Sequence, residues 1–173
     1  MSIEELNKLA YKLITTHIYN YYSSVKNRTE TRNLYELGLG NKTTPTSNFQ
    51  YEEFNPSTSV KLKGIFKNGG QKNCSIFEDG MAPYLKENLS AESWGRPLEK
   101  SWCNTPYSVT NVLKVSVGTL QWAEADDHSK WVVSNSYGCF GDMNRMDSQW
   151  KRGGSFFCLQ NEKLSKALRK SVL

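Results

Sequence analysis

Cys74 and His128 are the residues of this chain best suited to form a catalytic pair. A cysteine thiolate is a nucleophile, and a neighbouring imidazole can take up the thiol proton. Cys74 opens a predicted helix, whose start would lower the thiol pKa, and His128 directly precedes a predicted strand. One interpretation is therefore a thiol hydrolase. Gly80 and Pro83 interrupt the helix, which favours the other interpretation, a buried thiol and a histidine in a turn.

Two further groups contain residue types that bind metals or line cavities. Asp126, Asp127 and His128 are capable of metal binding, but such a polar run is typical of a solvated hairpin turn, so we expect no metal and no cofactor. His17 lies on the apolar face of a predicted helix. A hydrogen-bonded core histidine is favoured there over a ligand in a cavity between helix and sheet.

A third group combines cations with an aromatic ring. Arg145, Lys151 and Arg152 could contact phosphate, and Trp150 could stack on a base. We therefore treat these four residues as candidate RNA contacts. The alternative is a solvated loop, because charged clusters usually do no more than face water.

The elements that would position these residues begin with a long amphipathic helix over residues 3–25. Its apolar side chains recur at intervals of three and four, which is the period of one helix face. Ser2 and Glu5 can form a capping box at its start. Residues 29–37 predict a second, short helix that Gly38 ends. The apolar stripe of the first helix requires a broad cover, and a sheet would provide it.

Alternating apolar residues predict the strands of that sheet. Residues 39–58 predict a long loop, in which Phe49, Tyr51 and Phe54 form an edge strand or pin the loop to the body. Residues 125–153 predict a second long excursion around one short strand. Residues 76–89 suit a helix, or a strand that runs into one, and residues 164–173 suit a helix or a closing strand. The predicted strands are residues 59–66, 109–123, 131–134 and 155–159.

The stretch 109–123 is the strongest strand signal. Leu113, Val115 and Val117 would face the long helix. The side chains of Val112, Leu120 and Trp122 would then face away from it. An apolar outer face indicates a partner, so these three residues form a predicted partner interface. The alternative is that one of the long loops folds back and covers them.

Composition narrows the class of protein. The 173 residues carry a net charge of +5, which permits an acidic partner without requiring one. Mean hydropathy is −0.62, and no apolar run approaches the roughly 20 residues of a membrane-spanning helix. The four cysteines contain no CxxC pair, which argues against a zinc site. Because the first residues do not resemble a signal peptide, we expect an intracellular protein with reduced, buried thiols.

Four stretches, in their order along the chain, carry a resemblance to a known family. The run from His17 to Tyr22 resembles the end of the first helix of nuclear transport factor 2-like domains, and Arg32-Asn33-Leu34-Tyr35 resembles their second helix. The run from Val112 to Leu120 resembles their long valine-rich strand, and Ser155 to Leu159 resembles the next one. The closing asparagine-aspartate strand of that family is not visible. The expanded loops make the chain most similar to the small subunit of the messenger-RNA export receptor heterodimer.

The resemblance implies a single α+β domain over residues 1–173, in which a curved, mostly antiparallel sheet packs as a cone on the long first helix. It implies a non-catalytic transport adaptor that pairs with a larger export receptor carrying a related domain. It further implies binding to phenylalanine-glycine nucleoporins, a role with RNA, and shuttling between nucleus and cytoplasm. The alternative is a cavity-bearing enzyme or small-ligand binder of the same fold, or the thiol hydrolase of Cys74 and His128.

Overall fold

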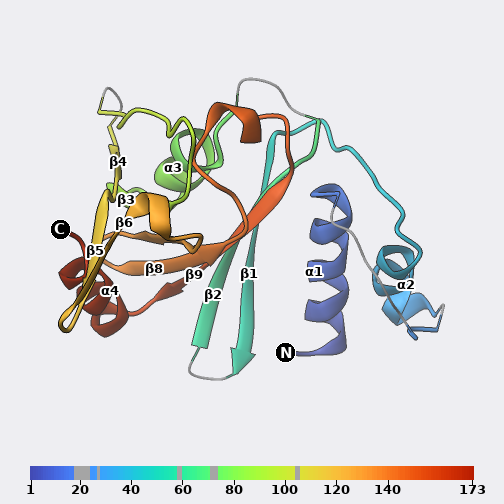
Figure 1. Ribbon diagram of the computed structural model, residues 1–173. Coiled ribbons are helices and arrows are strands. Elements are labelled where there is room, and N and C mark those ends of the chain that lie inside the picture. The colour runs from blue at the N-terminus through green and yellow to red at the C-terminus, as the bar shows by residue number, and fades with distance from the viewer. Residues whose placement is uncertain (18–23, 27, 58–59, 71–73, 104–105) are drawn as a thin grey trace.

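Most strands of the protein form one sheet (Figure 1). The computed structural model describes residues 1–17, 24–26, 28–57, 60–70, 74–103 and 106–173. Within this part of the chain, the sheet has seven strands in the order β1-β2-β9-β8-β7-β3-β4. Neighbouring strands are antiparallel, except that β3 and β4 run parallel. The strands are β1 (Phe49–Ser57), β2 (Val60–Lys67), β3 (Leu89–Ser93), β4 (Val109–Asn111), β7 (Lys130–Val133), β8 (Tyr137–Gly141) and β9 (Gly154–Gln160).

A separate hairpin and several helices surround this sheet. The hairpin consists of β5 (Lys114–Val117) and β6 (Leu120–Ala123). In Figure 1, α1 stands between the β1–β2 edge of the sheet and α2. The helix α4 lies against β7 and β8, near the hairpin. The helices are α1 (Ile3–Thr15), α2 (Arg32–Gly38), α3 (Ala82–Leu85) and α4 (Glu162–Lys170), and the short turns of helix are η1 (Thr29–Thr31), η2 (Ile76–Met81), η3 (Glu124–Asp126) and η4 (Asp147–Gln149).

The amino-terminal helix is shorter than predicted. The capping box of Ser2 and Glu5 is confirmed, but α1 ends at Thr15, and His17 adopts a left-handed backbone with φ of 60°. The half-buried ring of His17 lies 3.3 Å from the carbonyl oxygen of Thr43, so it sits at the helix end rather than in the core. The predicted continuation over residues 18–23 lies outside the described residues. The second helix is confirmed, since α2 ends at Gly38.

Both predicted long loops contain regular structure. The edge-strand interpretation of Phe49, Tyr51 and Phe54 is confirmed, because β1 contains all three and is the outermost strand of the sheet. The region 125–153 includes β7, β8 and η4 rather than a single excursion. The carboxyl-terminal ambiguity resolves to the helix α4, and Val172 adds one isolated bridge to Val115.

The prediction of one long strand over residues 109–123 is wrong. Gly118 has φ of +61°, a left-handed conformation that glycine adopts readily, and it reverses the chain between β5 and β6. Val115 is buried, but Leu113 and Val117 are 63% and 55% exposed. The side-chain assignment therefore fails: Val112 is buried in the core, Trp122 is half-buried, and Leu120 alone of the predicted interface is exposed.

Two apolar clusters hold the sheet and its helices together. The larger one joins the sheet to η2 and α3 through residues such as Ile65, Phe77, Met81 and Phe156. The smaller one consists of Val112, Val115, Trp131 and Val133, packed by Trp122, Leu168 and Val172. The buried hairpin residue Val115 thus packs toward α4 and not toward the amino-terminal helix.

The prediction of four reduced cysteines is also wrong. Cys139 and Cys158 are directly paired in the register of β8 and β9, and they form a disulfide. Cys74 is a buried free thiol and Cys103 is an exposed one. The spacing of 19 residues gave no indication of this pair, because only the strand register brings the two residues together.

The expected fold class is correct in its combination of helices with a mostly antiparallel sheet, but not in the arrangement of the first helix. In the part of the chain that the structure describes, the first helix has 13 residues and no cone-shaped sheet packs over it. In the described residues, no helix is long and apolar enough to cross a membrane.

Thr15 offers a test of how α1 packs. Its side chain is completely buried, and its hydroxyl accepts a hydrogen bond from Gln50 Nε2 at 2.7 Å. Thr15→Asp should therefore lower the free energy of unfolding by about 2 to 4 kcal/mol, because it buries a charge without a cation. Tyr11→Asp is the control on the exposed side of the same helix and should cost less than about 1 kcal/mol. Equal urea midpoints for the two variants would contradict this packing.

Candidate functional site

The end of β3 and the start of β7 bring an indole and an imidazole together. These strands are antiparallel, and Ser93 pairs with Lys130. The next residue after β3, Trp94, therefore lies near the turn that precedes β7. Its ring stacks on the ring of His128, with centroids 4.9 Å apart and planes inclined by 28°. His128 is exposed to solvent, so a substrate can reach its imidazole.

Hydrogen bonds shape the turn that carries His128. The Ser129 amide donates to Asp127 Oδ1, and Trp122 Nε1 donates to Asp127 Oδ2, both at 2.7 Å. Burial disfavours the Asp127 carboxylate, but these hydrogen bonds outweigh it and lower the pKa of the carboxyl group. Lys130 Nζ donates to the carbonyl oxygen of His128, which holds an ammonium beside the histidine backbone. The turn thus presents an imidazole and a cation together.

Glu92 is the unusual residue behind this turn. It is completely buried, opposite Trp131 in the strand register, and neither carboxylate oxygen has a hydrogen-bond partner among the described residues. Burial raises the pKa of Glu92 to about 7, and the nearby carboxylates of Asp127 and Glu124 raise it further in the same direction. A carboxyl group with this environment changes charge near neutral pH.

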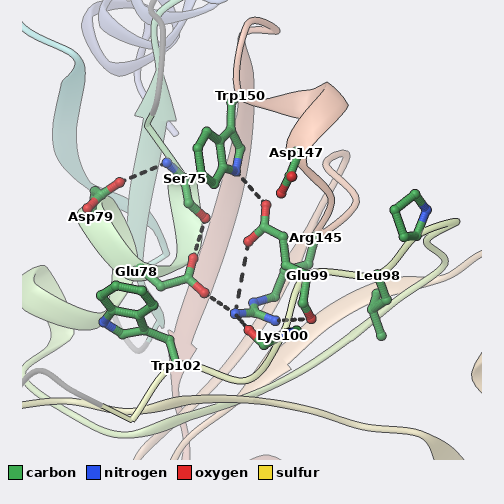
Figure 2. A pocket seen from close by; sticks show the side chains of 11 residues that line it. Ser75, Glu78, Asp79, Leu98, Glu99, Lys100, Trp102, Arg145, Asp147 and Trp150 are labelled. Carbon is green, nitrogen blue, oxygen red and sulfur yellow. Dashed lines mark hydrogen bonds and ion pairs between the residues drawn. The ribbon is translucent and has the colours of Figure 1, made fainter.

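A pocket of about 590 Å³ opens beyond the segment that follows Trp94 (Figure 2). Residues 97–100 form one side of it, η2 contributes Glu78 and Asp79, and the segment around η4 contributes Asp147 and Trp150. Trp102 completes the lining and is 44% exposed. In Figure 2 Trp150 lies above and Trp102 to the lower left of a polar cluster built around Arg145.

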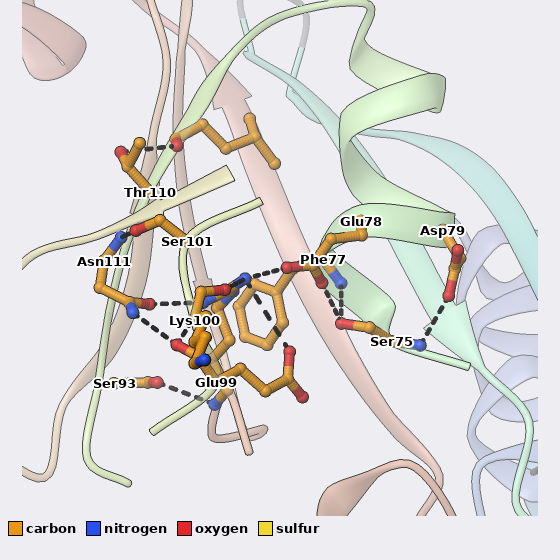
Figure 3. A network of polar contacts seen from close by, with 12 residues as sticks. Ser75, Phe77, Glu78, Asp79, Ser93, Glu99, Lys100, Ser101, Thr110 and Asn111 are labelled. Atoms are coloured by element: carbon orange, nitrogen blue, oxygen red, sulfur yellow. Dashed lines mark hydrogen bonds and ion pairs between the residues drawn. The ribbon is translucent and has the colours of Figure 1, made fainter. Parts of the chain in front are cut away.

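Arg145 is the centre of that cluster, and its side chain is only 1% exposed. Its Nη1 atom donates to the carbonyl oxygen of Glu99 at 3.0 Å and to Asn111 Oδ1 at 2.6 Å. Its Nη2 atom donates to the carbonyl oxygen of Lys100 at 2.8 Å and pairs with the Glu78 carboxylate. Figure 3 shows how this network joins η2, residues 99–101 and β4.

Glu99 is the second buried carboxylate of the cluster. Trp150 Nε1 donates to one of its oxygens, and the other lies 3.9 Å from Arg145 Nη2. Burial and the neighbouring Glu78 carboxylate raise the pKa of Glu99 to about 7, although Arg145 and the indole oppose this shift. The cluster of Arg145, Glu78 and Glu99 therefore carries little net charge near neutral pH.

The predicted pair of Cys74 and His128 has no structural support. Cys74 is buried beside η2, and burial raises the pKa of its thiol to about 11, which is the opposite of what a thiolate nucleophile needs. No contact joins it to His128, whose ring stacks on Trp94. Among the described residues, no group of three or more His, Cys, Asp or Glu side chains is placed to hold a metal ion.

The four predicted RNA contacts do not form one surface. Arg145 is buried and its charge is paired inside the protein, which contradicts a direct contact with phosphate. Trp150 lines the pocket, whereas Lys151 and Arg152 are exposed. The buried ammonium of Lys67 binds the carbonyl oxygens of Trp150 and Arg152 at 2.7 and 2.6 Å, so β2 fixes this loop.

Sequence reasoning missed Lys130, Trp94 and Glu92. A signal for Lys130 was present, because a lysine two residues after a histidine at the start of a strand places both charged groups near one strand end. No local signal marked Trp94 or Glu92, because the pairing of β3 with β7 is what brings Trp94 to His128 and places Glu92 opposite Trp131.

Comparison with known proteins identifies relatives of the chain. The model of the deoxyribonuclease II family matches residues 1–173. Cell-death-related nuclease 7 of Caenorhabditis elegans is 40% identical over 97 residues, which are 51% of this chain and 26% of that protein. Deoxyribonuclease-2-beta of Mus musculus is 36% identical over 57% of this chain and 30% of its own. Deoxyribonuclease-2 of C. elegans is 33% identical over 68% and 35%, respectively. The chain thus spans about a third of the length of these relatives or less.

These matches overturn the resemblance to nuclear transport factor 2-like domains. The relatives are nucleases, so the predicted non-catalytic adaptor, its export-receptor and nucleoporin partners and its localisation at the nuclear pore are all wrong. The resemblance rested on short apolar strands and aromatic pairs, which many sheets share because any half-buried strand needs them. The match over its whole length shows that the chain belongs to the deoxyribonuclease II family.

Proposed function

We propose that this chain takes part in the hydrolysis of phosphodiester bonds in DNA, with His128 and Lys130 in the reactive site. The observation that carries the proposal is membership of the deoxyribonuclease II family over residues 1–173. The structure supports these two residues because His128 is exposed and the Lys130 ammonium binds the carbonyl oxygen of the same residue. The net charge of +5 favours association with a polyanion.

The reaction needs the chemistry that these two side chains supply. Water adds to phosphorus, one phosphorus–oxygen bond breaks, and the departing oxygen takes a proton. An imidazole can transfer protons near neutral pH, and it can also attack phosphorus as a nucleophile. The Lys130 ammonium attracts the phosphate and offsets the negative charge that develops on its oxygens.

Trp94 has a positioning role in this proposal. An exposed histidine in a turn samples several rotamers, and ordering it costs conformational entropy. The stacked indole removes part of that freedom before the substrate binds. The bond from Lys130 to the His128 carbonyl oxygen fixes the backbone of the same residue. The imidazole is thus oriented from two sides.

The disulfide bears on where the protein works. A bridge between Cys139 and Cys158 is stable in an oxidising compartment and is lost where glutathione keeps thiols reduced. We infer an oxidising environment for the folded protein, in place of the predicted nuclear location.

Substitution of His128 tests the proposed function. His128→Ala should lower the rate of cleavage of a fluorescent DNA oligonucleotide by at least about 100-fold, because the proton-transfer group is lost. Lys130→Met should lower it by about tenfold or more, because a cation near the phosphate is lost. Circular dichroism should remain unchanged in both variants, since His128 is exposed and Lys130 is half-buried.

Two controls accompany that experiment. His17→Ala removes the only other histidine of the chain and should retain cleavage, as should Cys74→Ser. The proposal fails if the wild-type chain does not cleave DNA, or if His128→Ala cleaves as fast as His17→Ala.

Glu92 predicts how stability depends on pH. Its pKa of about 7 in the folded state exceeds the ordinary value of 4.5, so the folded state binds the proton more tightly than the unfolded state does. The contribution of Glu92 to stability should therefore be fully present below about pH 4.5 and should be lost as pH rises through 7. Glu92→Gln carries no ionisable proton, so its advantage over wild type should grow with pH and reach about 3 kcal/mol at pH 8.

Urea unfolding of both proteins at pH 4.5 and pH 8 measures this difference. Glu4→Gln is the matched control, because the Glu4 side chain is exposed and its substitution should shift the midpoints little. A Glu92→Gln variant that differs from wild type by the same amount at both pH values would show that Glu92 does not titrate between them.

A further inference from the structure

The side chain of Trp122 reaches from the hairpin β5–β6 to the turn that carries His128. Its indole Nε1 donates a hydrogen bond to Asp127 Oδ2 at 2.7 Å. Asp127 directly precedes His128, and the other oxygen of the same carboxylate accepts from the Ser129 amide at 2.7 Å. One carboxylate therefore joins the residues on either side of His128 and fastens them to the hairpin.

The hydrogen bond between Ser129 and Asp127 closes a turn with His128 at its centre. An aspartate that accepts from the amide two residues further on forms an Asx turn, which takes the place of a backbone turn. Burial opposes the charge of Asp127, but the hydrogen bonds from Ser129 and Trp122 lower the pKa of its carboxyl group. The acceptor is therefore ionised at neutral pH, and hydrogen bonds to a carboxylate are stronger than those between neutral groups.

The indole at the other end of this contact is held by apolar packing. Trp122 pairs with Val115 in the hairpin register. The half-buried ring packs on the cluster of Val112, Val115, Trp131 and Val133. Trp131 belongs to β7, the strand that the turn leads into. Because side chains in a packed cluster occupy defined rotamers, the indole offers its N–H at a fixed place beside the turn.

Backbone hydrogen bonds support the chain before and after His128. The Asp127 amide donates to the carbonyl oxygen of Glu124 at 3.1 Å, which ends the short helical turn η3. On the other side, Lys130 pairs with Ser93 of β3. The Asp127 carboxylate connects these two supports across the residue that they flank.

We propose that Trp122 is a positioning residue of the reactive site, which fixes the His128 imidazole relative to the substrate phosphorus through its hydrogen bond to Asp127. This role rests on the proposed function. Trp94 contacts the imidazole ring itself, whereas Trp122 acts through the backbone that carries it. The predicted role of Trp122 in a partner interface is thereby replaced by a contact within the chain.

Steady-state cleavage of a fluorescent DNA oligonucleotide by Trp122→Phe tests the proposal. This variant keeps an aromatic ring in the cluster and removes the N–H donor. Its kcat should fall about tenfold while KM changes less than about twofold, because a displaced catalytic group slows the reaction without weakening substrate binding. Leu168→Ala is the matched control, since Leu168 of α4 packs against the same cluster, and it should keep the wild-type kcat. Equal losses of kcat in both variants would assign the effect to packing and overturn the proposal.

Variants of Asp127 test the same hydrogen bond from its other side. Asp127→Asn retains one acceptor oxygen, which can still close the turn with Ser129, whereas Asp127→Ala retains none. We expect kcat to fall about tenfold in the first and about 100-fold in the second. Trp122→Phe combined with Asp127→Asn should cleave as fast as Asp127→Asn alone, because both changes remove one shared contact. Losses that multiply in the double variant would show that the two residues act independently and would contradict the proposal.

The imidazole also reports its position without a substrate. The chain has two histidines, so comparison with His17→Ala identifies the Cε1 proton resonance of His128. The stacked Trp94 ring shields the protons of this imidazole. The resonance should move toward that of a free imidazole in Trp122→Phe and in Asp127→Ala, and it should stay in place in Leu168→Ala.

The two measurements separate this proposal from the proposed function. If the resonance moves as expected but the wild-type chain leaves DNA intact, Trp122 still fixes the imidazole and the nuclease proposal fails. If the chain cleaves DNA and Trp122→Phe cleaves it with the wild-type kcat, the nuclease proposal stands and Trp122 does not position His128.

Discussion

The buried guanidinium of Arg145 is the interaction on which the site region depends. Removing such a charge from water is costly unless carboxylates and carbonyl oxygens replace the lost hydration. Here Glu78 of η2, the backbone of Glu99 and Lys100, and Asn111 of β4 supply that replacement. Three segments far apart in the sequence therefore meet at one side chain. Packing alone would not fix them, because residues 97–102 contain no strand or α-helix.

The same cluster is connected to the turn that carries His128. The amide of Arg145 donates to Ser93 Oγ at 2.8 Å, and the amide of Gly95 donates to Glu124 Oε1 at 2.9 Å. Trp94 lies between these two anchored residues, so its ring is presented to His128 by a backbone held on both sides. Hydrogen bonds on both sides of Trp94 thus connect the segment that contacts His128 to the Arg145 segment and to η3. A change in Arg145 would be felt at both places, since contacts within one network are not independent.

Sequence reasoning succeeded where the determining contacts are local. The capping box of Ser2 and Glu5 and the end of α2 at Gly38 depend on residues a few positions apart, and the structure has both. Strands β2 and β9 followed from alternation. The prediction of a long strand over residues 109–123 was wrong because Gly118 adopts a left-handed conformation that reverses the chain. The alternation of apolar and polar residues gives no indication of such a turn. The first helix failed at its carboxyl-terminal end, where the left-handed His17 stops it.

The site could be predicted only in part, for a related reason. The sequence offered Cys74 and His128 as a pair because both residue types are chemically suited, but chemistry alone does not bring two residues together. The ring that contacts His128 is that of Trp94, which the pairing of β3 with β7 brings there. The disulfide was missed because the compartment was inferred from the first residues of the chain, whereas the register of β8 and β9 decides the pair.

Glu92 shows why the site and the stability of the fold should be considered together. A buried carboxyl group without a hydrogen-bond partner destabilises the folded state, and proteins contain few of them. A residue of similar shape without the charge would fold better at this position. Groups that break such a local rule are expected mainly at functional or strained sites. Glu92 lies behind the turn that carries His128, where the carboxylates of Asp127 and Glu124 raise its pKa. The turn that positions the imidazole therefore also sets the cost of ionising Glu92.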